Sequence, residues 1–181
     1  MTEQDMIVWV DCEMTGLDRT KDKIIEIAVI ITDQDLNVVA EMDSITINQS
    51  DELLDNMNEW CIKHHGESGL TKRVKESKTS TKEAEDKILK FVKKHVKKER
   101  TAPLAGNTVY ADRQFLEREM PTFNEYLHYR IIDVSCFKEV AKRWYPTEFA
   151  AAPPKTYKHL ALDDIRESIK ELQYYRASIF K

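Results

Sequence analysis

Residues 7–17 have the sequence Ile7-Val8-Trp9-Val10-Asp11-Cys12-Glu13-Met14-Thr15-Gly16-Leu17. The apolar half predicts a buried strand, and the strand ends in two carboxylates two residues apart. Because side chains at i and i+2 of a strand point to the same face, Asp11 and Glu13 are expected to aim at one point in space. Two like charges held together are costly unless a cation lies between them. The alternative is a strand end with two solvated acids.

The composition limits the class of protein. A chain of 181 residues fits one domain, residues 1–181, with a sizeable core. Its apolar content of 41% and charged content of 33% indicate a folded globular protein rather than a disordered one. The net charge of −4 argues against tight binding to long nucleic acid, whose affinity depends on many basic contacts to phosphate. A short nucleic acid held by a few contacts stays possible.

The sequence shows no sign of a membrane or secretory protein. Its apolar stretches are shorter than the roughly 20 residues that span a bilayer. The acidic start, Met1–Asp5, has no apolar signal core. The cysteines, Cys12, Cys61 and Cys136, have no paired metal spacing, which favours a reducing compartment. We expect a cytoplasmic protein, and an organellar form stays open.

The order of elements predicts a mixed sheet. Residues 6–11, 23–33 and 38–48 are expected to form an antiparallel meander, with the β-branched run of residues 23–33 as a central strand. Shorter strands are expected at residues 104–107 and 131–133. Strands first, followed by alternating strands and helices, imply helices on both faces of the sheet.

Helices are expected in the following ranges: from 51 onward, 58–65, 69–75, about 81–95, 112–119, from 121 onward, 134–144 and 160–178. Residues 146–155, rich in alanine and proline, are expected to form a loop. In the 81–95 range the lysines surround an apolar stripe that includes Ile88 and Val92. This spacing predicts an amphipathic helix with a solvated basic face.

The candidate catalytic residues are acidic, with one histidine. They are Asp11, Glu13, Asp112, Asp164 and His159. Carboxylates without a matching cysteine or histidine cluster predict a hard cation, Mg²⁺ or Mn²⁺ rather than zinc. Two such ions about 3.5–4 Å apart stabilise the attacking and leaving oxygens of a phosphoryl displacement. Asp11 is the natural bridging ligand, and His159 is able to take a proton from water.

The spacing of the last motif leaves one choice open. His159 and Asp164 are five residues apart, roughly 140° around a helix, so His159 is expected on a loop or at the helix start. Asp163 and Asp164 point about 100° apart, and only one is expected to be a ligand. Spacing alone does not decide which one. Alternatively, both acids only complement the helix dipole.

Together these motifs resemble the oligoribonucleases, members of the DEDDh 3′-to-5′ exonuclease superfamily. The resemblance covers nearly the whole chain and is carried by residues 9–17, 22–28, 106–107, 112–113, 128–130, 133–135, 159–168 and 174–176. It implies an RNase H-like α/β fold, a five-stranded mixed sheet flanked by helices. It also implies an exoribonuclease that hydrolyses very short RNAs, especially 5′-phosphorylated dinucleotides, with two metal ions and a histidine general base. The family pattern selects Asp164 over Asp163.

The resemblance also assigns substrate-binding residues. Leu17 and Trp60 would wedge the bases. Thr108, Arg130 and Ser135 would cap the 5′ phosphate. Thr108 stands where serine is common in relatives, so the hydroxyl is kept and the extra methyl group is expected to tighten the pocket.

One further residue of the family pattern implies a dimer. Tyr129 would reach in from the partner subunit of an obligate homodimer and stack on a base.

Tyr129 and Arg130 have a structural alternative, in which they form the end of a helix with a surface cation. Trp60 is alternatively a partly buried helix residue, and Ser135 an N-cap. Cys12 is expected to point away from the acids into the core.

Two other functions have to be weighed. A non-catalytic RNA-binding module would be expected to lose metal-binding acids, and here all of them are present together with the histidine. A related enzyme acting on longer DNA or RNA is disfavoured by the acidic net charge and the small size.

Overall fold

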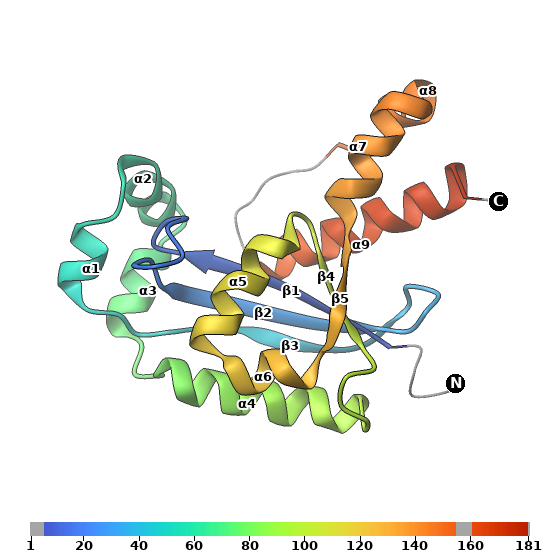
Figure 1. Ribbon diagram of the computed structural model, residues 1–181. Coiled ribbons are helices and arrows are strands. Elements are labelled where there is room, and N and C mark those ends of the chain that lie inside the picture. Colours follow the sequence, from blue (N-terminus) through green and yellow to red (C-terminus); the bar gives the residue numbers. More distant parts are fainter. Residues whose placement is uncertain (1–5, 155–160, 181) are drawn as a thin grey trace.

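A five-stranded mixed sheet forms the centre of this computed structural model, which describes residues 6–154 and 161–180 (Figure 1). The strands are β1 (Ile7–Met14), β2 (Ile24–Thr32), β3 (Val38–Thr46), β4 (Pro103–Gly106) and β5 (His128–Asp133). Their order in the sheet is β3-β2-β1-β4-β5. The pairs β1–β2 and β2–β3 are antiparallel, and β1–β4 and β4–β5 are parallel. The predicted meander and mixed sheet are confirmed.

The first strand is longer than predicted. It was expected to end at Asp11, but β1 continues to Met14. The reason is that the ladder with β2 continues, with Asp11 opposite Ala28 and Glu13 opposite Glu26. Both acids therefore lie within a paired strand, and β2 fixes their backbone positions on one side.

Nine helices are described, and they surround the sheet. They are α1 (Asp51–Asp55), α2 (Glu59–Glu67), α3 (Leu70–Glu76), α4 (Thr81–His95), α5 (Val109–Glu119), α6 (Pro121–Tyr126), α7 (Val134–Trp144), α8 (Pro146–Ala150) and α9 (Ala161–Ser178). The loop predicted for residues 146–155 is wrong at its start, because Pro146 begins α8, where a proline fits the first helical turn. Likewise, α5 begins at Val109 rather than Asp112.

The side chains of β1 alternate between two cores. Val10 and Cys12 belong to the larger core, together with residues of α4, α5 and α6. Trp9 belongs to the second core, with residues of α9. Asp11 and Glu13 therefore face the α9 side of the sheet. The prediction that Cys12 is a core residue is confirmed.

Helices α1 to α3 form a small unit at one end of the sheet, beside the loop that follows β1 (Figure 1). This unit has its own apolar cluster, formed by Ile25, Leu54, Met57, Cys61, Leu70 and Val74. Within the cluster Ile25 is the member that comes from the sheet. The unit thus has little apolar contact with the strand that carries the acids.

Helix α4 matches its sequence pattern. Ser80 and Glu83 form a reciprocal capping box at its start. Ile88 and Val92 are fully buried, while the lysines Lys90, Lys93 and Lys94 are all exposed. None of the described helices is long and apolar enough to cross a membrane.

Glu85 is a buried acid that joins two helices. It lies on α4, and its Oε1 accepts hydrogen bonds from the backbone N–H groups of Thr122 at 2.7 Å and Phe123 at 3.0 Å. These groups belong to the first turn of α6, which has no helical acceptor of its own. Lys82 lies 3.0 Å from the other carboxylate oxygen.

We expect Glu85→Ala to lower the free energy of unfolding by about 1–3 kcal/mol, because it leaves two backbone donors unsatisfied at a buried helix start. Thermal denaturation would measure this as a lower melting temperature. Glu85→Gln keeps one acceptor oxygen and should lose much less. Equal losses in the two variants would contradict a capping role.

Candidate active site

Three carboxylates converge at the C-terminal end of β1. Asp11, Glu13 and Asp164 each offer an oxygen, and these oxygens lie within 4.8 Å of one another. We call these three residues the acidic cluster. Asp11 and Glu13 come from one face of β1, and Asp164 comes from the first turn of α9. Because all the donors are carboxylate oxygens, the set fits a hard divalent cation.

The neighbouring acid, Asp163, is engaged elsewhere. Its Oδ1 accepts a hydrogen bond from Nη1 of Arg166 at 2.9 Å. The same guanidinium also pairs with Glu41 on β3. The structure thus brings Asp164 rather than Asp163 to the acidic cluster, a choice that spacing left open.

Asp112 lies beside the acidic cluster. It is 7% exposed on the first turn of α5. Its Oδ1 accepts a hydrogen bond from the backbone N–H of Cys12 at 2.9 Å. Cys12 stands between Asp11 and Glu13 in the chain, so this bond holds the Asp112 carboxylate against the strand that carries the other acids.

Burial and mutual repulsion disturb the titration of these acids. Burial, and after it the charges of Asp112 and Glu13, raise the pKa of Asp11 well above its usual range. Burial, followed by Asp164, raises the pKa of Glu13 to about 8. Burial also raises the pKa of Asp112 to about 7, although the hydrogen bond from Cys12 acts in the opposite direction. A bound cation would offset the repulsion that these shifts report.

The predicted general base lies outside the described residues. His159 precedes the described part of α9, which begins at Ala161. Its role therefore stays a prediction. The described start of α9 nevertheless fixes Asp164 in the first helical turn, three residues after Ala161.

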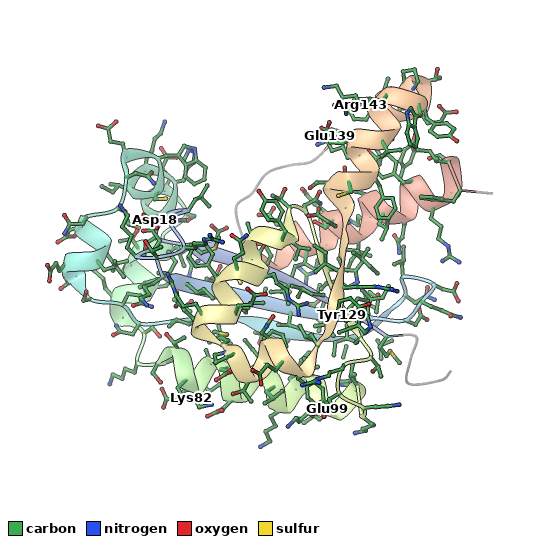
Figure 2. The ribbon with its side chains drawn as sticks, viewed as in Figure 1. Asp18, Lys82, Glu99, Tyr129, Glu139 and Arg143 are labelled. Atoms are coloured by element: carbon green, nitrogen blue, oxygen red, sulfur yellow. The ribbon has the colours of Figure 1, made fainter. Side chains whose placement is uncertain are left out.

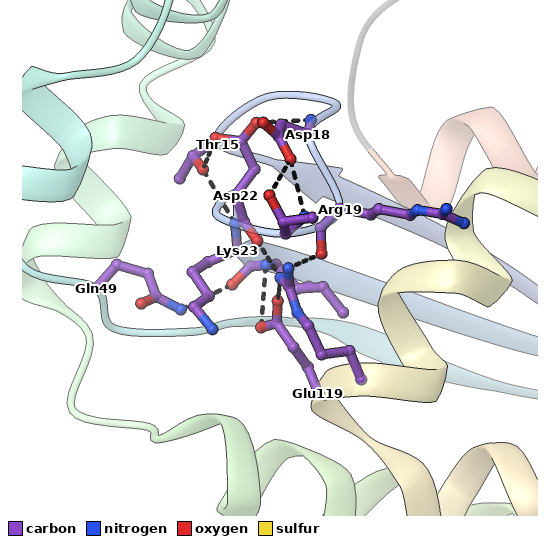
Figure 3. A network of polar contacts seen from close by, with 10 residues as sticks. Thr15, Asp18, Arg19, Asp22, Lys23, Gln49 and Glu119 are labelled. Atoms are coloured by element: carbon purple, nitrogen blue, oxygen red, sulfur yellow. Dashed lines mark hydrogen bonds and ion pairs between the residues drawn. The ribbon is translucent and has the colours of Figure 1, made fainter.

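Hydrogen bonds to Asp22 close the loop that follows β1 (Figure 3). The Asp22 carboxylate accepts hydrogen bonds from the Thr15 hydroxyl at 2.9 Å and the Asp18 backbone N–H at 2.8 Å. Gly16 is required here, since a Cβ atom would lie 2.4 Å from an Asp22 oxygen. The closed loop leaves Leu17 80% exposed.

A cavity of about 400 Å³ opens between this loop and α2. We call it the Trp60 cavity, and its lining is Cys12, Glu13, Met14, Gly16, Leu17, Asn58, Trp60, Cys61 and His65. Trp60 lies on α2 and is 54% exposed, so the alternative of a partly buried helix residue stands beside its place in the cavity lining. Because Glu13 lines the cavity and also belongs to the acidic cluster, the two features adjoin.

The hydroxyl groups of Thr108 and Ser135 meet at the start of α5. Their oxygens lie 3.0 Å apart. Asp133 holds both residues, because its Oδ1 accepts hydrogen bonds from the backbone N–H of Thr108 at 2.9 Å and of Ser135 at 3.0 Å. Asp133, not Ser135, is the N-cap of α7, so the alternative role of Ser135 is wrong. Thr108 adopts a left-handed φ of 55°.

Tyr129 and Arg130 lie elsewhere in the chain. Both are on β5, and the Arg130 guanidinium carbon lies 5.4 Å from the centre of the Tyr129 ring. Neither residue lines the Trp60 cavity. Tyr129 is 72% exposed and lies well away from the loop that carries Asp18 (Figure 2). Both residues belong to a strand, so their alternative as a helix end is wrong.

A model of the family described as "Exonuclease" matches residues 8–172. The mitochondrial oligoribonuclease of Bos taurus is 58% identical over 97% of this chain and 73% of its own length. The probable oligoribonuclease of Dictyostelium discoideum is 57% identical over 97% of this chain and 90% of its own. The oligoribonuclease of Francisella tularensis subsp. novicida is 51% identical over 99% and 98%.

The chain belongs to the oligoribonuclease family. Membership in this family of exonucleases confirms the predicted enzyme class, a 3′-to-5′ exoribonuclease. Because the family relatives include both mitochondrial and bacterial proteins, the predicted compartment stays a prediction.

Solved structures outside the oligoribonucleases share the fold. Exonuclease I from Methylocaldum szegediense superposes with a TM-score of 0.73 at 17% identity, covering 98% of this chain and 41% of that one. E. coli Exonuclease I in complex with a dA16 oligonucleotide gives 0.73 at 14% identity, covering 97% and 41%. The chain thus spans about two fifths of these longer proteins, and they confirm the exonuclease fold.

The sequence did not predict that two polar residues, His65 and Glu26, lie at the site. No chemical role was predicted for His65, yet it lines the Trp60 cavity. Glu26 is 2% exposed and adds to the charge that raises the pKa of Glu13. A single acid inside the apolar run of β2 was a signal for Glu26, whereas nothing in the spacing of His65 marked it.

In EDTA, the melting temperature should fall by roughly 5–10 °C between pH 5 and pH 8. The pKa of Glu13 lies at about 8 in the folded chain, above its ordinary 4.5. The folded state therefore binds more protons than the unfolded state between these values, and stability is lost as pH rises. Glu13→Gln should flatten this slope, and Mg²⁺ should stabilise most at pH 8. A melting temperature in EDTA that rises over this range would contradict the prediction.

Proposed function

We propose that this chain hydrolyses very short RNA oligonucleotides, especially 5′-phosphorylated dinucleotides, to mononucleotides from the 3′ end. The observation that carries the proposal is that the acidic cluster adjoins the Trp60 cavity, with Glu13 common to both. Carboxylates suited to a divalent cation thus lie beside an apolar cavity that would seat a base. The names of the family relatives point to the same substrate class.

Asp11, Glu13, Asp112 and Asp164 would hold two divalent ions, Mg²⁺ or Mn²⁺. The donor set fits, since it consists of carboxylate oxygens gathered within 4.8 Å for three of the four acids and of Asp112 held against β1. Asp11, on the central strand, would bridge the ions. When bound, such ions stabilise the attacking and leaving oxygens of a phosphoryl displacement.

His159 would act as the general base. It takes a proton from a water molecule, whose oxygen forms a bond to the phosphorus atom. The bond between phosphorus and the 3′ oxygen of the preceding nucleotide breaks, and that oxygen ends with a proton. The products are a mononucleotide with a 5′ phosphate and a chain shortened by one. An imidazole suits this step because it titrates near neutral pH.

The Trp60 cavity would bind the bases without base specificity. Leu17 and Trp60 present apolar surfaces that are 80% and 54% exposed in the described chain. An aromatic ring stacks on any base, because every base has a π-face. Sequence-independent cleavage would follow from this contact.

The hydroxyl groups of Thr108 and Ser135 would cap the 5′ phosphate together with Arg130. Asp133 engages the backbone N–H groups of both hydroxyl residues, which supports a fixed pair of hydroxyls at the start of α5. Arg130 would add charge-assisted hydrogen bonds. Only a substrate whose 5′ end lies at the cap can occupy the cap and the base-binding residues at the same time. This would favour dinucleotides over longer RNA.

Tyr129 would complete the site from the partner subunit of a homodimer. Its ring is 72% exposed and outside the lining of the Trp60 cavity in its own subunit. A stacking role in its own subunit is therefore disfavoured, and a role in a neighbouring subunit is compatible with its exposure.

Action on longer nucleic acid is the competing function. One fold neighbour was solved with a dA16 oligonucleotide, but at 14% identity that likeness concerns the fold. The net charge of −4 offers little general attraction for a long polyanion. Comparing rates on RNAs of two to twenty nucleotides separates the two functions.

Asp164→Asn should reduce dinucleotide hydrolysis in Mg²⁺ by about 1,000-fold or more, since a lost metal ligand removes several kcal/mol of transition-state stabilisation. Asp163→Asn is the matched control, because this acid pairs with Arg166 outside the acidic cluster. It should keep activity within about threefold, which is less than 1 kcal/mol. Substantial activity of Asp164→Asn, or of the wild type in EDTA, would refute the metal mechanism.

Arg130→Ala should reduce the preference for a 5′-phosphorylated dinucleotide over a pentanucleotide by roughly tenfold, the scale of one charge-assisted hydrogen bond of about 1.5 kcal/mol. The measurement is the ratio of kcat/KM for the two RNAs. Arg143→Ala serves as the control, because Arg143 pairs with Glu139 on α7. A wild-type chain that cuts the pentamer as fast as the dinucleotide would exclude the cap.

A further inference from the structure

His65 lies between the two parts of the proposed site. It is in the last turn of α2 and only 4% exposed. Its Nε2 lies 2.9 Å from the backbone oxygen of Met14 on β1. A carbonyl oxygen only accepts, so the Nε2–H donates and the orientation of the ring is fixed. This bond crosses from the helix unit to the strand that carries the acids.

The other edge of the ring faces a member of the acidic cluster. Nδ1 of His65 lies 4.0 Å from Oε2 of Glu13, and the two side chains are 5% and 14% exposed. The Glu13 carboxylate is therefore enclosed by the His65 ring on one side and by Asp11 and Asp164 on another. In such a confined space the ring limits the rotamers open to the carboxylate.

The same ring supports Trp60. The two rings meet edge to face, with centroids 6.4 Å apart. Trp60 is 54% exposed, so core packing alone does not fix its direction. An edge-to-face contact with a buried, hydrogen-bonded ring gives the indole a fixed neighbour.

Other contacts also tie the helix unit to the sheet, since the Ser77 hydroxyl after α3 donates to the Thr46 oxygen of β3 at 2.7 Å. Ile25 is the sheet member of the small apolar core under α1 to α3. A second polar tie joins Arg73 of α3 to Glu26 at 3.3 Å, and Glu26 is opposite Glu13 in the β1–β2 ladder. The distance between Trp60 and the acids thus depends on polar contacts as well as on apolar packing.

We propose that His65 is a positioning residue that aligns the stacking surface of Trp60 with the acidic cluster through Glu13. This inference rests on the proposed function and deepens it. The hydrogen bond to Met14 fixes the ring, one edge of the ring restrains Glu13, and the ring supports Trp60. Alignment matters because displacements on the order of 1 Å between binding and reacting groups reduce rates by about 100-fold.

A purely structural histidine makes a different prediction. If His65 only filled the buried face of α2, its replacement would lower stability and the active fraction, and the remaining enzyme would be normal. A positioning residue changes turnover and metal dependence in folded enzyme, while binding of the bases is kept.

The test compares His65→Phe, His65→Gln and the control His95→Phe, a histidine on α4 that contacts Phe91. Phenylalanine keeps a ring beside Trp60 and loses both nitrogens, while glutamine keeps a donor able to reach the Met14 oxygen. Each variant is assayed for melting temperature, for binding of a 5′-phosphorylated dinucleotide in EDTA, and for turnover across a Mg²⁺ titration.

For His65→Phe we expect dinucleotide binding within about threefold of the wild type, turnover lowered by about 10–100-fold, and a higher Mg²⁺ concentration for half-maximal rate. His65→Gln should recover part of the turnover, and His95→Phe should match the wild type. Wild-type turnover and Mg²⁺ dependence in His65→Phe would overturn the inference. A loss that only follows the folded fraction would also overturn it.

The wild type and Asp164→Asn distinguish the two levels of failure. A wild type that does not cleave the dinucleotide in Mg²⁺, or an Asp164→Asn variant that does, refutes the proposed function and the inference with it. A wild type that cleaves, an inactive Asp164→Asn and an unchanged His65→Phe refute the inference alone.

Discussion

Like-charge repulsion at the end of β1 is the constraint on which the rest of the structure depends. Asp11, Glu13 and Asp164 hold oxygens within 4.8 Å, and their neighbourhood raises the pKa of Asp11 and Glu13. Isolated side chains would move apart. They do not separate here because Asp11 and Glu13 belong to a strand that pairs with β2 along its length, while a long helix fixes Asp164. The scaffold thus stores the repulsion that a cation would relieve.

The sheet topology brings the other side of the site to the same place. Parallel strand β4 pairs with β1, and Gly106 at its end lies so close that a Cβ atom would be 2.9 Å from the Val10 oxygen. This close approach lets the chain pass directly into α5. Thr108 then starts the helix, and Asp112 reaches back to the Cys12 N–H within one turn. One glycine therefore determines where two groups of the site lie.

The parts of the fold that could be predicted are those with a periodic pattern in the local sequence. The strands, the amphipathic α4 and the shared face of Asp11 and Glu13 follow from periods of two and 3.6 residues. Long-range contacts left no such signal. His65 meets Met14 across 51 residues, and Glu85 meets Thr122 across 37. The strand that continues through Glu13 was also missed, because pairing with β2 rather than apolar content extends it.

The two parts of the site depend on different interactions. The Trp60 cavity, with its exposed Leu17 and Trp60 side chains, offers apolar contact that needs no charge. The acidic cluster repels a phosphate until a cation neutralises it. Base stacking in the proposed substrate is therefore independent of metal, whereas a bound metal would favour the approach of the scissile phosphate to the acidic cluster. Long nucleic acid depends on many phosphate contacts, but a dinucleotide gains a large share of its contact from two bases. An acidic protein can therefore bind a polyanion if the polyanion is short.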